Sequence, residues 1–197
     1  GVVLFDLQRR SDFDRGLAHQ ARAQGAELRT GVDVREVENR SDAVRVTPRN
    51  GDPLEARFVV GADGAGTRVG RSVGLVNQRD SGVALDAEVE VDPATFRAEN
   101  NRATFNINFV ERGYGWTFPK QGYLALGVGG YESNQPYNDL IQEYIDTALP
   151  GADVESIDLY GHPLPFYQGE DSVVQGRVGL IGDAAGMVDA LSGEGIF

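Results

Sequence analysis

The sequence contains no cysteine, a single lysine and only two histidines among its 197 residues. The lack of cysteine excludes disulfide bonds, thiolate metal sites and thiol catalysis, and it favours a cytoplasmic location. The histidines, His19 and His162, fall in separate segments, the first in a helical pattern and the second beside Pro163 in an expected loop. Two isolated histidines predict neither a metal centre nor a catalytic triad.

Long apolar runs are also missing, although 41% of the residues are hydrophobic. No run reaches the length that crosses a bilayer, so we expect a soluble protein. Neither an initiator methionine nor a signal peptide is visible at Gly1, and the chain stops at Phe197 where an expected helix has barely begun. These features predict an internal fragment of a longer protein.

Basic residues are outnumbered, and the formal net charge is −12. This balance argues against a nucleic-acid partner, because phosphate binding needs a basic face. Lys120 is the only lysine, and the other basic residues are arginines. Two hypotheses account for an acidic, lysine-poor surface: adaptation to high salt, and a GC-rich genome that favours arginine codons.

The first part of the chain predicts one helix and then a small antiparallel sheet. Ser11 is a good N-cap and Gly25 a good C-terminal stop for a helix with one apolar face (Phe13, Leu17, Ala18 and Ala21). Residues 26–29 are typical of a strand. Further strands are expected at 32–37, 43–47 and 54–60, with Asn50-Gly51 as a two-residue turn between the last two. A three-stranded meander should result.

The middle of the chain predicts a second, largely antiparallel sheet. Strand patterns cover residues 83–91, 104–110, 115–118 and 123–128. A helix begins at Pro136 and ends before Pro150, and residues 154–160 form a further strand. Residues 161–176 are typical of a polar connection and contain two prolines.

The last stretch, from residue 177 onward, carries the clearest functional pattern. Residues 177–181 predict a buried strand, and Gly182 lets the backbone turn so that Asp183 lies just past the strand end, where open α/β folds bind ligands. The small residues that follow would let a flat ligand lie against the backbone. A second small-residue cluster, 192–195, predicts a helix start that favours negative charge.

This stretch resembles the G-D-A-A-G…G-E-G-I signature of the geranylgeranyl reductase family, within the para-hydroxybenzoate-hydroxylase-like FAD group. The resemblance implies that Asp183 binds the ribityl chain of FAD and that the helix start faces the flavin pyrimidine ring. It assigns cofactor contacts to Gly182, Asp183, Ala184, Gly186, Gly193, Glu194, Gly195 and Ile196. Ala190 stands where the family usually has proline. The alternative is an ordinary strand–loop–helix with glycines for turning.

Residues 61–69 resemble the family's second flavin motif, G-A-D-G-x-x-S-x-V-R, with Thr67 in place of Ser and Gly70 in place of Arg. The resemblance assigns Asp63 and Gly64 to the FAD diphosphate region, and Arg68 or Arg71 could meet phosphate. The alternative is an Asp-Gly turn that closes a strand.

Residues 10–26 resemble the R-x-x-F-D…L…A…G-A segment of the same flavoproteins, in which the arginine approaches the cofactor. Arg10 inherits that role by resemblance. The alternative is a solvated arginine next to a helix start.

Residues 114–120 and 126–130 resemble the Y-x-W-x-F-P…G-x-G motif of the substrate-binding sheet in geranylgeranyl reductases. The resemblance assigns Tyr114, Trp116, Phe118 and Pro119 to a polyisoprenoid chain, which aromatic side chains would suit. The alternative places the three aromatic residues on one face as ordinary sheet core.

The strand and helix patterns predict a mixed α/β fold, and the resemblance implies a Rossmann-like FAD-binding domain of para-hydroxybenzoate-hydroxylase type. Its opening strand–G-x-G-x-x-G–helix would be missing. Residues 1–80 and 176–197 would form the FAD-binding domain, and 81–175 an inserted antiparallel substrate domain.

The implied function is FAD-dependent reduction of carbon–carbon double bonds in a geranylgeranyl or other prenyl chain, with NADPH or ferredoxin as electron donor. A monooxygenase or halogenase of the same fold stays open, as does a non-catalytic fragment that does not bind FAD alone. No catalytic acid or base is identified, and no metal is expected. Peripheral contact with a membrane and the oligomeric state stay open.

Overall fold

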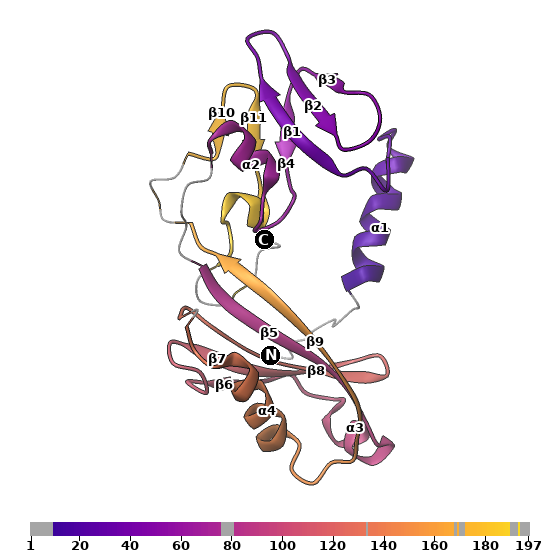
Figure 1. Ribbon diagram of the computed structural model, residues 1–197. Helices are drawn as coiled ribbons and strands as arrows, with labels where there is room; N and C mark the ends of the chain where they lie inside the picture. The colour runs from indigo at the N-terminus through magenta and orange to yellow at the C-terminus, as the bar shows by residue number, and fades with distance from the viewer. Residues whose placement is uncertain are drawn as a thin grey trace, which may run out of the picture. The chain divides into compact units, whose positions relative to one another are not determined.

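The computed structural model describes residues 10–75, 81–132, 134–167, 169, 172–189 and 193 (Figure 1). The chain divides into two compact units: unit 1 is Gly1–Leu28 with Val83–His162, and unit 2 is Arg29–Gly82 with Pro163–Phe197. The two units are defined by their packing, whereas the domains expected from the sequence are defined by their roles. The assignment of residues 1–80, 81–175 and 176–197 to cofactor and substrate domains therefore stays a prediction.

Unit 1 is built on a five-stranded sheet with the strand order β6-β7-β8-β5-β9 (Figure 1). The strands are β5 (Ser81–Val91), β6 (Thr104–Ile107), β7 (Gly113–Lys120), β8 (Tyr123–Gly130) and β9 (Val154–Pro165). The pairs β6/β7, β7/β8 and β8/β5 are antiparallel. The expected antiparallel sheet is thus confirmed, together with its first four strands.

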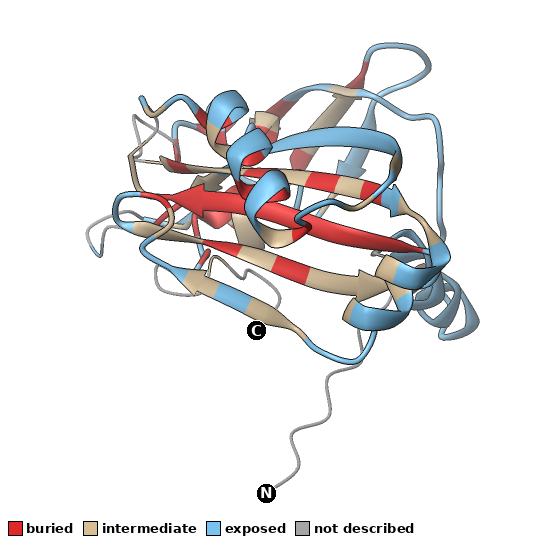
Figure 2. Cartoon of the chain, turned by 90° about the horizontal axis from the view of Figure 1, so that it is seen from below, coloured by how far each residue is buried: buried red, intermediate tan, exposed pale blue. Residues whose placement is uncertain are grey.

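One face of this sheet is covered by α4 (Tyr137–Ala148), the helix expected after Pro136. Figure 2 shows β8 buried along its whole length in the middle of the sheet. Tyr144 of α4 is fully buried, and its hydroxyl lies 3.3 Å from Asn106 Nδ2 and 3.2 Å from Thr117 Oγ1. A Cβ on Gly115 would lie 2.4 Å from the Tyr144 ring. Glycine is therefore required there for the helix to pack.

Two features of this unit differ from the sequence expectation. Helix α3 (Pro93–Glu99) was not expected, although Asp92-Pro93 is an N-terminal signal: the Asp92 carboxylate accepts from the backbone N–H of Ala94 and Thr95. Strand β9 runs on to Pro165, so His162 and Pro163 lie in a strand and not in a loop. Proline is tolerated there because β9 is the last strand of the sheet, where an N–H can be absent on the open side.

The first helix is α1 (Arg10–Ala23), which begins one residue before the expected cap Ser11. Gly25 ends it as expected, with φ of 97° and a pair of closing bonds: Gly25 N–H to Arg22 O and Ala26 N–H to Ala21 O. Residues 26–29 form no strand, so that prediction is wrong. They are exposed, and none of the strands in the described part of the chain pairs with them.

Unit 2 contains the expected meander, β1 (Val34–Asn39), β2 (Val44–Pro48) and β3 (Leu54–Ala56). The turn between β2 and β3 is longer than the two residues expected at Asn50-Gly51, because pairing starts only at Val46 and Leu54. A tight turn would set Pro48 opposite Pro53, and neither has an N–H to donate.

The expected strand 54–60 is two strands in the structure. Its second half, β4 (Val59–Gly61), joins another sheet of order β10-β11-β4, with β10 (Val174–Gln175) and β11 (Val178–Leu180). Strands β11 and β4 are parallel, which confirms a short buried strand just before Gly182. The core of this unit joins these strands to α2 (Arg68–Val73), the meander and the one-turn helix η1 (Gly182–Ala185).

Candidate functional site

The parallel pair β4/β11 brings the two expected flavin motifs to one edge of a sheet. Leu180 pairs with Gly61, and the N–H of Ile181 donates to Gly61 O at 3.0 Å. Asp63 follows β4 by two residues and Asp183 follows β11 by three. Because both strands end at the same edge, the two carboxylates lie on the side where parallel α/β sheets bind ligands.

The backbone after β11 turns as the sequence predicts. Gly182 has φ of 55°, and Gly186 ends η1 with φ of 73°, a conformation that favours glycine. The N–H of Gly186 donates to Asp183 O and that of Met187 to Gly182 O, both at 3.0 Å. The side chains of Ala184 and Ala185 are fully buried in the core of unit 2. Their small size thus serves packing, and their contact with a cofactor stays a prediction.

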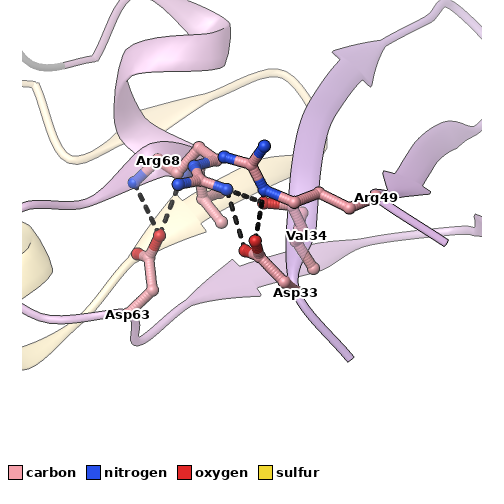
Figure 3. Close-up of polar contacts among 6 residues, drawn as sticks. Asp33, Val34, Arg49, Asp63 and Arg68 are labelled. Atoms are coloured by element: carbon pink, nitrogen blue, oxygen red, sulfur yellow. Dashed lines mark hydrogen bonds and ion pairs between the residues drawn. The ribbon is translucent and has the colours of Figure 1, made fainter. Parts of the chain in front are cut away.

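Asp63 closes the start of α2, as Figure 3 shows. Its Oδ2 accepts from the backbone N–H of Arg68 at 2.7 Å and of Val69 at 3.1 Å, while Thr67 Oγ1 accepts from Gly70 N at 2.9 Å. Burial alone would raise the pKa of Asp63, but bonds from Thr67 and these backbone groups lower it below its ordinary value. Threonine therefore caps the helix in place of the family's serine.

Arg68, one of two arginines expected to meet phosphate, binds elsewhere in unit 2 (Figure 3). Its guanidinium donates to the Asp33 carboxylate at 2.8 Å and to the Val34 carbonyl at 2.6 Å. Arg68 thus ties α2 to β1. Arg71 is exposed in the last turn of the same helix.

Several expected cofactor residues are described only in part. Gly64 lies in the turn after β4 with φ of 77°. Gly193 has φ of 72°, and its N–H donates to Asp189 O at 2.8 Å. Glu194, Gly195 and Ile196, and with them the expected helix start, lie outside the described residues. Arg10 is the first residue of α1, but its side chain is not among those described.

The expected substrate residues in unit 1 form an aromatic row along β7. Tyr114, Trp116 and Phe118 alternate with Gly115 and Thr117, which are the buried positions that face α4. The row therefore lies on the sheet face opposite α4, and both the assignment of these rings to a substrate and the alternative of ordinary sheet core stay predictions. Each of the three is half-buried.

Strand β6 extends this row into a wider apolar surface. Phe105 pairs with Trp116 and Ile107 with Tyr114, so both lie on the same face, and they are 49% and 70% exposed. Ring centroids are 5.1 Å apart for Phe105 and Phe118, and 5.7 Å for Tyr114 and Trp116. We call Phe105, Ile107, Tyr114, Trp116 and Phe118 the aromatic face. Pro119 continues β7 beyond it and is half-buried.

Sequence reasoning missed one residue of this face, Asp86 on β5. The indole N–H of Trp116 donates to Asp86 Oδ1 at 3.0 Å. Burial raises the pKa of Asp86 above its ordinary value and outweighs the lowering by this bond. The sequence offered one signal, an acidic residue between the apolar residues Leu85 and Ala87. It gave no sign of the partner, Trp116, which lies 30 residues further along the chain.

Comparison with known proteins identifies the family of the chain. The FAD binding domain family matches residues 7–196, almost the whole chain. The chain belongs to this family of FAD-binding domains. It is 31% identical over 97% of its length to a chloroplastic geranylgeranyl diphosphate reductase of Oryza sativa, of which it covers 44%. It is 27% identical over 95% of its length to digeranylgeranylglycerophospholipid reductase 2 of Methanosphaera stadtmanae, of which it covers 49%.

Solved structures confirm the fold. A geranylgeranyl bacteriochlorophyll reductase-like protein from Thermoplasma acidophilum gives a TM-score of 0.75 at 22% identity, over 95% of this chain and 50% of that one. The flavin-dependent halogenase CmlS gives 0.71 at 21% identity, over 95% and 37%. The resemblance to geranylgeranyl reductases is thus confirmed, as is the para-hydroxybenzoate-hydroxylase type of fold. The chain spans about half the length of the curated relatives it matches.

Two kinds of feature are absent from the described part of the chain. None of its helices has the length and apolar character needed to cross a bilayer. Within the same described residues, no group of three or more His, Cys, Asp or Glu side chains could hold a metal ion.

Proposed function

We propose that this chain is part of an FAD-dependent reductase that saturates carbon–carbon double bonds of a prenyl chain. The observation that carries the proposal is the aromatic face: five apolar side chains, half-buried or exposed, gather on the sheet face away from α4. A surface of this kind suits a long apolar ligand. Relatives named as reductases of geranylgeranyl compounds support the same class of substrate.

The edge of the β4/β11 pair fits the polar part of FAD. Asp183 lies just past β11, where its carboxylate could accept hydrogen bonds from ribityl hydroxyls. FAD, when bound and reduced, would supply the hydride, and NADPH or ferredoxin is our proposed electron source. The chain's own part is to hold the cofactor at this edge and the prenyl chain on the aromatic face.

A direct role for Asp63 with the diphosphate needs other donors beside it. Asp63 and Thr67 already take the N–H groups of Arg68, Val69 and Gly70. At the start of α2, a phosphate group would therefore find a negatively charged carboxylate and no free backbone N–H donor among these three. We propose that Asp63 shapes the turn next to the diphosphate, and that residues 1–197 alone bind FAD weakly. A micromolar or tighter constant by isothermal titration would contradict the second statement.

The first test compares Asp183→Ala with Asp52→Ala, an exposed aspartate of the same unit. Loss of a carboxylate acceptor should weaken FAD binding by about 1.5–3 kcal/mol, roughly 10-fold to 150-fold. It is measured as flavin retained after gel filtration of a protein of the relatives' length that carries this chain. The Asp52 variant should retain flavin as the wild type does. Equal flavin content in all three proteins would contradict the role of Asp183.

The second test separates substrate from cofactor. In the same longer protein, Trp116→Ala should reduce turnover of a prenyl substrate more than it reduces FAD content, because Trp116 lies on the aromatic face. Phe58→Ala, an exposed aromatic residue of unit 2, serves as the control. Equal loss of flavin and prenyl binding would count against the proposal.

A monooxygenase or halogenase is the second candidate function. The similarity to a flavin-dependent halogenase favours it at the level of fold. Product analysis distinguishes the two: a reductase adds two hydrogens to the prenyl chain, whereas the alternatives add oxygen or halogen and consume dioxygen. Peripheral membrane contact, which a prenyl lipid would require, is tested by flotation with liposomes.

A further inference from the structure

Three strands of unit 1 align Trp116, Gly127 and Asp86 in one row. Trp116 of β7 pairs with Gly127 of β8, and Gly127 pairs on its other side with Asp86 of β5. Neighbouring strands lie about 4.8 Å apart, so Trp116 and Asp86 are separated by roughly 9.6 Å of sheet. The indole spans this gap, since its N–H reaches Asp86 Oδ1 at 3.0 Å.

The indole can cross β8 only because Gly127 has no side chain. A Cβ there would lie 2.0 Å from Cζ2 of the Trp116 ring, and one on Gly129 would lie 3.3 Å from Cζ3. The ring therefore rests against the backbone of β8. Two features hold the Trp116 ring in place: Gly127, against which it packs, and the Asp86 carboxylate, which accepts its N–H.

The fixed indole supports the rest of the aromatic face. Its ring centroid lies 5.7 Å from that of Tyr114 and 6.5 Å from that of Phe118. Phe105 completes the group at 6.0 Å from Tyr114 and 5.1 Å from Phe118. If the indole left its place over Gly127, this apolar surface would change in width and shape.

We propose that Asp86 is a positioning residue that holds Trp116 across β8 and thereby sets the shape of the surface on which the prenyl chain lies. The part that concerns the prenyl chain rests on the function proposed above. The anchoring of the indole does not, because it concerns only side chains of unit 1. A carboxylate is suited to the task, since a bond to a charged acceptor is stronger than one to a neutral acceptor.

Other charged side chains act on Asp86, and the test must separate their effect from that of the bond between Asp86 and Trp116. Glu88 on β5 raises the pKa of Asp86, while His162 on β9 and Lys120 on β7 lower it. Glu88→Gln is the matched control, because Glu88 pairs with Ala125 two residues along the same ladder. It removes one acid of the strand and leaves the Trp116 bond in place.

Trp116 is the only tryptophan, so its fluorescence reports on this row alone. In the chain as it stands, Asp86→Ala should shift the emission maximum to longer wavelength and lower the anisotropy, because the indole is released toward water. Asp86→Asn, which keeps an acceptor oxygen, and Glu88→Gln should both emit at the wild-type wavelength. The wild-type emission should change with pH as Asp86 titrates, and this change should be absent in Asp86→Asn.

A wild-type spectrum for a folded Asp86→Ala chain would overturn the anchoring, and circular dichroism checks the fold. In a protein of the relatives' length, Asp86→Ala should raise KM for a prenyl substrate about tenfold, equivalent to about 1.4 kcal/mol, with flavin content unchanged. Asp86→Asn should restore KM. An unchanged KM would overturn the effect on substrate. If no variant reduces a prenyl substrate while the fluorescence behaves as stated, the proposed function fails and the anchoring stands.

Discussion

Asp63 in unit 2 and Asp86 in unit 1 are carboxylates next to the two candidate binding regions, and their pKa values shift in opposite directions. Asp63 is exposed and accepts backbone N–H groups, so its ionised form is favoured. Asp86 is half-buried in a sheet face, and this burial penalises its ionised form more than the bond from one indole N–H favours it. The first aspartate stabilises a turn as an anion, whereas the second holds a side chain at some cost in stability.

The same contrast separates the glycines of the two units. In unit 2, Gly182 and Gly186 have positive φ and allow the chain to turn. In unit 1, Gly115 and Gly127 lie in ordinary strands and leave room for the rings of Tyr144 and Trp116. Glycine thus shapes the backbone in one unit and makes room for side chains in the other.

The largest effect is expected from Gly127→Ala. A methyl group 2.0 Å from the indole must displace it or the strand, and such overpacking costs up to about 3 kcal/mol in the free energy of unfolding. Urea unfolding measures the loss, and Trp116 emission should shift with it. Gly16→Ala in α1 should instead stabilise by about 0.5–1 kcal/mol, because alanine has the higher helix propensity and its methyl group would meet no other described element within 4 Å. Equal stability of the Gly127 variant and the wild type would refute the steric role.

Asp63→Ala should have the next largest effect. It leaves the N–H groups of Arg68 and Val69 without their acceptor, and loss of such a cap costs about 1–2 kcal/mol. Because the pKa is lowered on folding, this stabilisation is present above the unfolded pKa and is lost as the pH falls through the folded one. Thermal unfolding from pH 7 to below about pH 4 should therefore bring wild type and variant together. A constant difference across that range would argue against the capping carboxylate.

Asp86→Asn should change stability less and in the other direction. The amide oxygen can still accept from Trp116, and the burial penalty of a charge is removed, so we expect a gain of up to ~1 kcal/mol at pH 7. The pKa of Asp86 is raised on folding. The stability that the protonated Asp86 contributes is therefore fully present below the pKa of the unfolded state, and it is lost as the pH rises through the pKa of the folded state. The gain should thus shrink on acidification. A variant less stable than wild type at pH 7 would show that the charge itself stabilises unit 1.

Local sequence signals predicted much of the fold. The apolar run of β8, the helical spacing of α4 and the strand before Gly182 were predicted correctly, because each depends on neighbouring residues. The errors have a common cause in pairing between distant segments. Residues 26–29 pair with no strand among the described residues, whereas β9 extends through Pro163 because its place in the sheet tolerates proline.

The candidate site residues also divide into those that a local motif indicates and those that depend on pairing between distant strands. The sequence singled out Asp63, Asp183 and the aromatic residues of β7 as site candidates, since each belongs to a short motif, and their roles stay predictions. It did not identify Asp86, whose importance comes from the register of three strands. Nor did it show which face of β7 packs under α4, because Gly115 and Thr117 are less apolar than the rings that alternate with them.

The smallest effect is expected from Asp33→Asn, which tests whether charge alone anchors α2. Asp33 binds the guanidinium of Arg68 at 2.8 Å and also that of Arg49, but more than half of its side chain is exposed. Arg68 also donates to the Val34 carbonyl, so it keeps a partner in β1 after the substitution. Exposed ion pairs contribute about 0–1 kcal/mol, so we expect a loss of roughly 0.5 kcal/mol at low salt that disappears in about 1 M KCl. Asp63→Ala, measured alongside, should keep most of its larger loss in KCl, because bonds to backbone N–H groups are less sensitive to screening. If both variants lost the same stability and recovered it in salt, Asp63 would act as a surface charge rather than as the acceptor for the first N–H groups of α2.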